Sequence, residues 1–198
     1  MKNVGIAMTN FANESSCRIH SNFVEQSPVM IIVPLEEKHW TEVKRIYEEG
    51  IATGNATFES SAPTWENWSS SHLPFSRLVA EENGEVLGWA ALSKVSDRCV
   101  YGGVAEVSVY VSAAASGKGV GAALLHALIE TSEQNNIWTL TAGIFPVNES
   151  SIHLHQKFGF RLVGRREKIG KMNGVWRDTL LYERRSAAVG RHQAETSS

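Results

Sequence analysis

Three glycines lie at the start of an apolar helical pattern in the stretch VSAAASGKGVGAALLHALIE, residues 111–130, where they could let a phosphate bind. Glycine has no Cβ, so a ligand can approach the backbone closely at Gly117, Gly119 and Gly121. The free N–H groups at a helix start, together with the positive end of the helix dipole, favour an anion at that place. A plain flexible turn entering a helix would look the same, and the glycines alone leave both interpretations open.

Two titratable side chains could transfer protons. Glu106 begins the alternating stretch EVSVYV, where it shares one strand face with Ser108 and Tyr110 while the valines occupy the other. His155 lies in a helical pattern, and an imidazole can gain or lose a proton near neutral pH. Taken alone, Glu106 would be a solvated strand carboxylate and His155 a partly buried helix histidine.

The elements that would position these groups alternate between strand and helix patterns. Asn83-Gly84 and Asn173-Gly174 each separate two apolar runs, which predicts two hairpins. Helical periodicity follows Glu36 and ends at Gly50, and it appears again after Gly119. Thr64 and Asn148 are suitable N-caps for two more helices, the second of which ends at Gly159. The remaining strand patterns are MIIVPL, VAEVSVYV and IWTLTAGIF. This order, an antiparallel start and then a β-α-β-α-β run, predicts a mixed α+β fold.

Composition narrows the class of protein. The 198 residues suit one domain at 29–186, preceded by an N-terminal extension at 1–28 and followed by a C-terminal tail at 187–198. A net charge of −2 gives no general attraction to nucleic acid or to acidic membranes. No apolar run approaches the roughly 18 residues of a membrane span. Cys17 and Cys99 make no disulfide framework, which favours a cytoplasmic location, and no Cys/His cluster has metal-ligand spacing.

Two common phosphate-binding motifs do not fit the glycine loop. A P-loop needs G-x-x-x-x-G-K-[ST], but Gly117-Lys118 is followed by another glycine, and Ser112 stands at the earlier glycine position. A dinucleotide fingerprint is nearly matched by Gly117, Gly119 and Ala122. That fingerprint also needs an acid at the end of the next strand, and TLTAGIF has none.

The segment VYVSAAASGKGVGAALL resembles the pyrophosphate loop of the GNAT-type N-acetyltransferases, [QR]-x-x-G-x-[GA] after a strand. Gly119 and Gly121 match its small positions, while Ser116 replaces the usual Arg or Gln and leaves fewer side-chain contacts to phosphate. NESSIHLHQKFGF is similar to the second signature of that family. With NATFESSAPTWENW and KIGKMNGVWRDTLLYERR, the chain over residues 30–185 resembles the phosphinothricin acetyltransferase group.

The resemblance implies a GNAT fold, with a mixed central sheet flanked by helices, and acetyl-CoA as cosubstrate without a metal. It implies acetylation of the amino group of a small amino acid or analogue, and commonly a homodimer. Glu106 then becomes the general base, while His155 protonates the leaving thiolate or relays the amine proton. The tryptophans of the family stretches, Trp65, Trp68 and Trp176, are expected to pack in the core or an interface.

The same resemblance assigns the binding residues. The coenzyme would pair with the strand at residues 109–111, meet the glycine loop through its pyrophosphate, and touch Asn148. The full set is Val109, Tyr110, Val111, Gly117, Lys118, Gly119, Val120, Gly121, Ala122 and Asn148. Thr57, Phe58 and Glu59 would form a wall of the substrate pocket. Lys94 and Arg98, the latter preferred for its bidentate fork, could meet a substrate carboxylate.

Two alternatives stay open. The amine could instead belong to a polyamine, an aminoglycoside or a protein N-terminus. The chain could also be an acyl-CoA-binding sensor without catalysis, although the presence of Glu106 and His155 argues against this.

Overall fold

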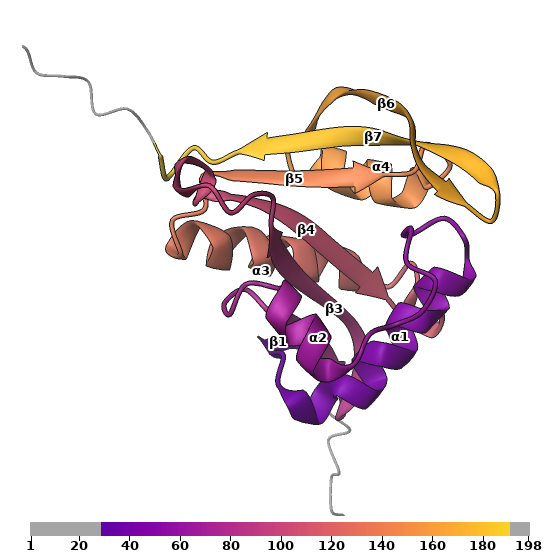
Figure 1. Cartoon of the computed structure of the whole chain (residues 1–198). Helices are drawn as coiled ribbons and strands as arrows, with labels where there is room; N and C mark the ends of the chain where they lie inside the picture. The colour runs from indigo at the N-terminus through magenta and orange to yellow at the C-terminus, as the bar shows by residue number, and fades with distance from the viewer. Residues whose placement is uncertain (1–28, 191–198) are drawn as a thin grey trace, which may run out of the picture.

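A seven-stranded mixed sheet forms the centre of the protein in the computed structural model, which describes residues 29–190 (Figure 1). The expected extension at 1–28 and residues 191–198 of the expected tail lie outside the described residues. The strands are β1 Ile31–Pro34, β2 Leu78–Glu82, β3 Glu85–Lys94, β4 Val104–Val111, β5 Thr139–Ile144, β6 Arg161–Met172 and β7 Val175–Arg185. The helices are α1 Trp40–Ala52, α2 Trp65–Ser71, α3 Val120–Gln134 and α4 Glu149–Lys157.

The sheet has the order β1-β2-β3-β4-β5-β7-β6, which confirms the mixed α+β prediction. All neighbours are antiparallel except β4 and β5, which run parallel because α3 connects them. Both predicted hairpins form. Asn83 and Gly84 have φ of 52° and 81°, and Asn173 and Gly174 have φ of 49° and 81°, the positive values that a two-residue hairpin turn requires.

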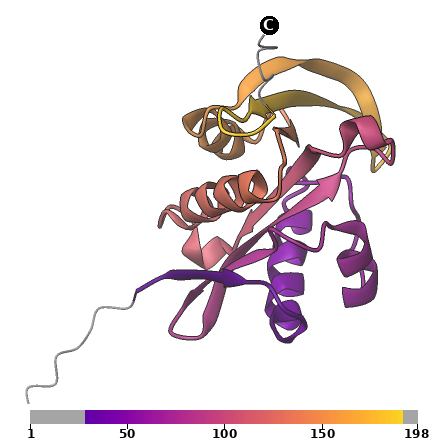
Figure 2. The same ribbon diagram turned by 90° about the vertical axis from the view of Figure 1, so that its left-hand side faces the viewer.

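Helices cover both faces of the sheet (Figure 2). Helices α3 and α4 pack on one face around Leu124, Leu125 and Leu128. Helices α1 and α2 pack on the other face around Trp68 and Trp89. The alternation of β4 divides its side chains between these layers, which confirms that Glu106 and the valines point to opposite faces.

Three local expectations can be compared directly with the structure. Thr64 and Asn148 cap α2 and α4 as predicted, with side chains that accept hydrogen bonds from the N–H groups of Asn67 and Ser151. Helix α1, however, continues through Gly50 and ends at Ala52. Gly50 is there for close packing, because a Cβ at this position would lie 2.7 Å from Tyr110 Cδ1.

The three tryptophans of the family stretches divide between the core and the surface. Trp68 is fully buried and Trp65 packs against the same core cluster. Trp176 is 56% exposed on β7, so it lies outside the core of the described chain, and its packing in an interface stays a prediction. Just after the predicted domain end at residue 186, the backbone N–H groups of Ala188 and Val189 donate to Ser186 Oγ.

Strands β4 and β5 separate after a short paired segment, which Figure 1 shows as two diverging arrows. Their register covers three pairs, from Val104 with Thr139 to Glu106 with Thr141. Beyond this point, β4 remains paired with β3 through Val111 but has no strand partner on its other side among residues 29–190. The backbone groups of β4 that face β5 are therefore free to pair with an extended ligand.

Candidate active site

Glu106 stands beside an open place on the sheet, at the point where β4 and β5 begin to separate. Its side chain is exposed although β4 has neighbouring strands on both sides. Gly143 of β5 is exposed as well. Apart from chain neighbours, the one heavy atom of the described residues within 4 Å of a Cβ built at Gly143 is Glu106 Oε1, at 3.5 Å. A small molecule can therefore reach the middle of the sheet next to the Glu106 carboxylate.

Two tyrosines border this face toward α1. The rings of Tyr47 and Tyr110 meet edge to face at 4.8 Å, and Tyr110 stacks on Trp89 at 4.6 Å. Burial raises the pKa of both hydroxyls, and the charge of Glu59 raises it further. Both hydroxyls therefore stay protonated at neutral pH and can donate a hydrogen bond. Thr57 hydrogen-bonds to the same two side chains.

The loop after α1 borders the site and reaches toward β5 and β6. Phe58 packs edge to face on Phe145 at 4.8 Å and lies over Gly170 of β6, where a Cβ would come within 2.5 Å of its ring. The backbone oxygen of Asn55 accepts a hydrogen bond from Asn148 Nδ2 at 3.3 Å. The structure thus brings Thr57, Phe58 and Glu59, predicted as a pocket wall, to the same face of the sheet as Glu106.

The glycine loop leads into the N-terminus of α3. Gly119 is the N-cap of α3 with φ of 83°, and Gly117 has φ of 77°. A Cβ at either position would meet no heavy atom of the described chain within 4 Å, so the space in front of the helix N-terminus is open. Lys118 is exposed there, whereas the Val120 side chain is buried in the core and can offer only its backbone.

His155 is buried in α4, with 4% of its surface exposed. Its Nδ1 lies 2.8 Å from the carbonyl oxygen of Ser151, so Nδ1 carries the proton and donates it to that oxygen. Burial lowers the pKa of the ring, which keeps it neutral at pH 7. Nε2 consequently presents a lone pair, and it has no hydrogen-bond partner within residues 29–190.

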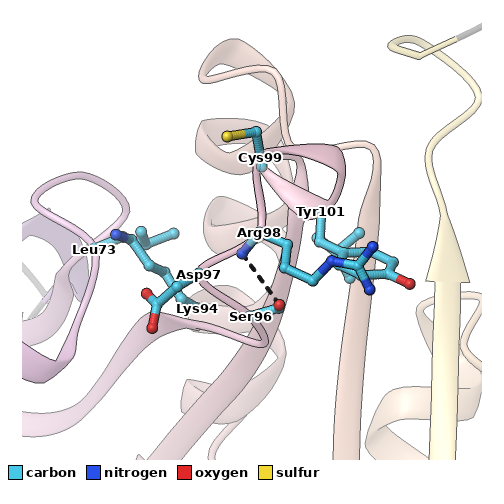
Figure 3. A pocket seen from close by; sticks show the side chains of 9 residues that line it. Leu73, Lys94, Ser96, Asp97, Arg98, Cys99 and Tyr101 are labelled. Carbon is cyan, nitrogen blue, oxygen red and sulfur yellow. Dashed lines mark hydrogen bonds between the residues drawn. The ribbon is translucent and has the colours of Figure 1, made fainter.

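Lys94 and Arg98 lie around a cavity of about 220 Å³ at the start of β4 (Figure 3). Lys94 pairs with Ala105, which belongs to the core on the α3 side, so the pairing places Lys94 on the face opposite Glu106. Figure 3 shows the Arg98 side chain extending beside Tyr101, and its guanidinium lies 5.7 Å from the ring centroid. The structure does not bring either cation next to Glu106, and their role stays a prediction.

Sequence reasoning missed Gly143 and Arg177. Gly143 appears in the strand pattern TLTAGIF, where an isolated glycine signals a close approach to the backbone. Arg177 lies within NGVWRD, and nothing in that motif marks it. In the structure its guanidinium lies 4.6 Å from the centroid of Phe145, on the border of the site.

Two further properties bear on function. Within residues 29–190, no group of three or more His, Cys, Asp or Glu side chains could hold a metal ion. No helix in this part of the chain is long and apolar enough to cross a membrane.

Comparison with known protein families gives one match over the centre of the chain. Residues 39–160 match the model of the acetyltransferase (GNAT) family. The match includes α1, the β4 strand with Glu106, the glycine loop and α4 with His155.

Individual proteins are similar over half of the chain or more. A phosphinothricin N-acetyltransferase of Streptomyces coelicolor is 33% identical over 70% of this chain and 86% of its own length. An L-methionine sulfoximine/L-methionine sulfone acetyltransferase of Pseudomonas paraeruginosa is 36% identical over 51% of this chain and 59% of its own. A phosphinothricin acetyltransferase of Sinorhizobium meliloti, solved in complex with AcCoA, superposes with a TM-score of 0.74 at 29% identity, over 81% of this chain and 90% of that one.

Proposed function

The chain belongs to the acetyltransferase (GNAT) family, and from this premise we propose that it transfers the acetyl group of acetyl-CoA to the α-amino group of a small amino acid or analogue. The observation that carries the proposal is the Glu106 carboxylate beside exposed Gly143, at the point where β4 and β5 separate. The names of the relatives support the substrate class. Release of CoA from acetyl-CoA in the presence of such amino acids tests it.

Glu106 is the proposed general base. An amine is largely protonated near pH 7 and attacks only as the neutral base, so a proton must be removed beside the acyl donor. The exposed carboxylate of Glu106 can accept that proton over the Gly143 backbone, directly or through water. The coenzyme supplies the activated acetyl thioester. We propose direct transfer to the amine, since Cys99 lies on the exposed β3–β4 loop rather than beside Glu106.

His155 is proposed as a proton acceptor that would act through the opening between β4 and β5, because α4 packs on the sheet face opposite Glu106. Because Nδ1 donates to the Ser151 carbonyl, Nε2 has a lone pair and no proton to give. Nε2 could accept the amine proton first and then pass it to the leaving thiolate, so both roles considered from the sequence remain part of the proposal. The effect of removing this lone pair is stated below, together with that of Glu106.

The coenzyme would occupy the two openings described above. Its amide-bearing arm can pair with the β4 backbone at residues 109–111, which has no strand partner toward β5. Its pyrophosphate can accept hydrogen bonds from the backbone of residues 117–122, with the Lys118 charge nearby. Asn148 already caps α4 and donates to Asn55, so its contact with the coenzyme would be an additional one.

Filling the space in front of α3 should weaken coenzyme binding. Asparagine tolerates positive φ better than other residues with a side chain, so Gly119→Asn keeps the backbone and occupies the open space. We expect the Kd for acetyl-CoA, measured by calorimetry, to rise at least about tenfold, or about 1.4 kcal/mol. Gly174→Asn is the matched control, because Gly174 has φ of 81° and equally open surroundings. If the two variants bind acetyl-CoA with equal affinity, the pyrophosphate of the coenzyme does not bind at this loop.

We also propose that the enzyme is a homodimer. The β6–β7 hairpin exposes a group of apolar side chains, namely Leu162, Val163, Ile169, Val175 and Trp176. Such a patch is often covered in an assembly. Light scattering should give twice the chain mass of 21.8 kDa, whereas a mass of 21.8 kDa would contradict the dimer.

A further inference from the structure

We infer that Arg177 and Thr179 of β7 form a subsite for an anionic group at the end of the substrate's side chain. This inference rests on the proposed function, because it places the amine of the substrate beside Glu106. It goes beyond that function by selecting, among small amino acids, those whose side chain ends in a carboxylate or phosphinate.

Arg177 is held at the border of the site by neutral partners. Its Nη2 donates to Asn55 Oδ1 at 3.0 Å, and its guanidinium lies over the Phe145 ring at 4.6 Å. Gly170, its partner in the β6–β7 register, lets Phe58 pack beside it. Three segments that are distant in sequence therefore fix this guanidinium in one place, which reduces the entropy that a ligand must remove on binding.

Within residues 29–190, no acidic side chain neutralises the charge of Arg177. Its neighbours on the hairpin have acidic partners: Arg165 pairs with Asp178, and Arg161 with Glu183. Arg177 has no acidic group within 4.0 Å in the part of the chain that the structure describes. A guanidinium in this state can form a charged, bidentate pair with an oxyanion.

Thr179 provides a second polar group on the same face. Leu180 and Tyr182 belong to the core on the α3 and α4 side, so alternation places Arg177, Thr179 and Leu181 on the face of the active site. Thr179 is 6% exposed, and its hydroxyl has no hydrogen-bond partner among residues 29–190. Buried hydroxyls are usually paired, and this one lacks an acceptor that a bound anion would supply.

Spacing decides which end of the substrate reaches this subsite. Gly143 pairs with Leu181, and Phe145, under the Arg177 guanidinium, follows two residues later, about 6–7 Å along a strand. The α-carboxylate of an amino acid lies within about 4 Å of its amine and falls short of Arg177 when the amine is beside Glu106. A group three or four bonds along the side chain reaches it.

The test compares two substrates of similar length, phosphinothricin with its anionic phosphinate and L-methionine sulfone with a neutral end. The wild-type enzyme should show kcat/KM at least about tenfold higher for phosphinothricin. Arg177→Leu should lose about 10- to 100-fold with phosphinothricin and less than twofold with the sulfone. Thr179→Val, which keeps the side-chain shape, should show a smaller loss, also confined to phosphinothricin.

Lys171→Met is the matched control. It removes a positive charge from the same hairpin, but from the opposite face, where Lys171 lies beside Trp176. It should leave both substrates unchanged. If the wild-type enzyme acetylates both substrates equally, or Arg177→Leu lowers both equally, the subsite is wrong and the proposed function stands. If it acetylates neither these nor other amino acids, the proposed function fails and the subsite with it.

Discussion

Glu106→Gln is expected to lower kcat by about 100-fold or more, because the amide cannot accept the proton of the substrate amine. The affinity for acetyl-CoA should not change, since the carboxylate lies on the face of β4 opposite the valines and away from the glycine loop. The deficit should shrink as the pH rises, because more of the amine is already neutral. Both effects can be measured by steady-state kinetics between about pH 6.5 and 9.5. Over this range the substrate amine changes from mostly protonated to mostly neutral.

Glu85→Gln is the control, because Glu85 is an exposed strand carboxylate at the remote β2–β3 hairpin. A relay through His155 adds a second expectation. His155→Phe should also lower kcat, and the double variant should lose little more than Glu106→Gln alone, since residues that act in one path are not additive. If the double variant instead loses kcat by the product of the two single losses, His155 is not in the proton path of Glu106. If Glu106→Gln keeps wild-type turnover at pH 7, Glu106 is not the base.

Gly143→Val should lower kcat/KM by about 100-fold, an effect as large as loss of the base, because its side chain fills the place of the amine. Gly143 has no positive φ, and a Cβ there meets Glu106 Oε1 at an ordinary contact distance of 3.5 Å. The fold should therefore tolerate valine, and the melting temperature should stay or rise, since glycine in a strand costs about 0.5–1 kcal/mol relative to alanine.

Gly164→Val provides the comparison for this variant. Gly164 also lies in a strand, and a Cβ there meets nothing within 4 Å in the described part of the protein. Both variants should bind acetyl-CoA like the wild type, and only Gly143→Val should lose turnover. Full activity of Gly143→Val would move the substrate to another part of the surface.

Local sequence signals predicted much of the fold. Both Asn-Gly hairpins and the two capped helices depend on neighbours in sequence, and the structure confirms them. The family resemblance is confirmed by the match to residues 39–160. Gly50 shows the limit of local rules: it reads as a helix stop but serves the contact with Tyr110, which depends on how α1 packs against β4.

The site was less accessible from the sequence. The role of Gly143 depends on the strand register that places β5 between Glu106 of β4 and Leu181 of β7. The role of Arg177 depends on the loop that carries Asn55, which is 122 residues away in sequence. Lys94 was named as a candidate because it precedes the strand of Glu106, but the strand pairing places it on the other face. Long-range register and loop packing cannot be read from one segment at a time.

The most direct measurement is a turnover assay with acetyl-CoA and a panel of amino acids that includes phosphinothricin and L-methionine sulfone, alongside polyamines, aminoglycosides and peptide N-termini. Free CoA thiol and the acetylated product are followed together, the product by mass spectrometry. The expected result is stoichiometric release of CoA with an acetyl group on the α-nitrogen of an amino acid, lost in Glu106→Gln. Stoichiometric acetyl-CoA binding without CoA release would instead indicate a sensor, and turnover confined to the other amines would contradict the amino-acid substrate.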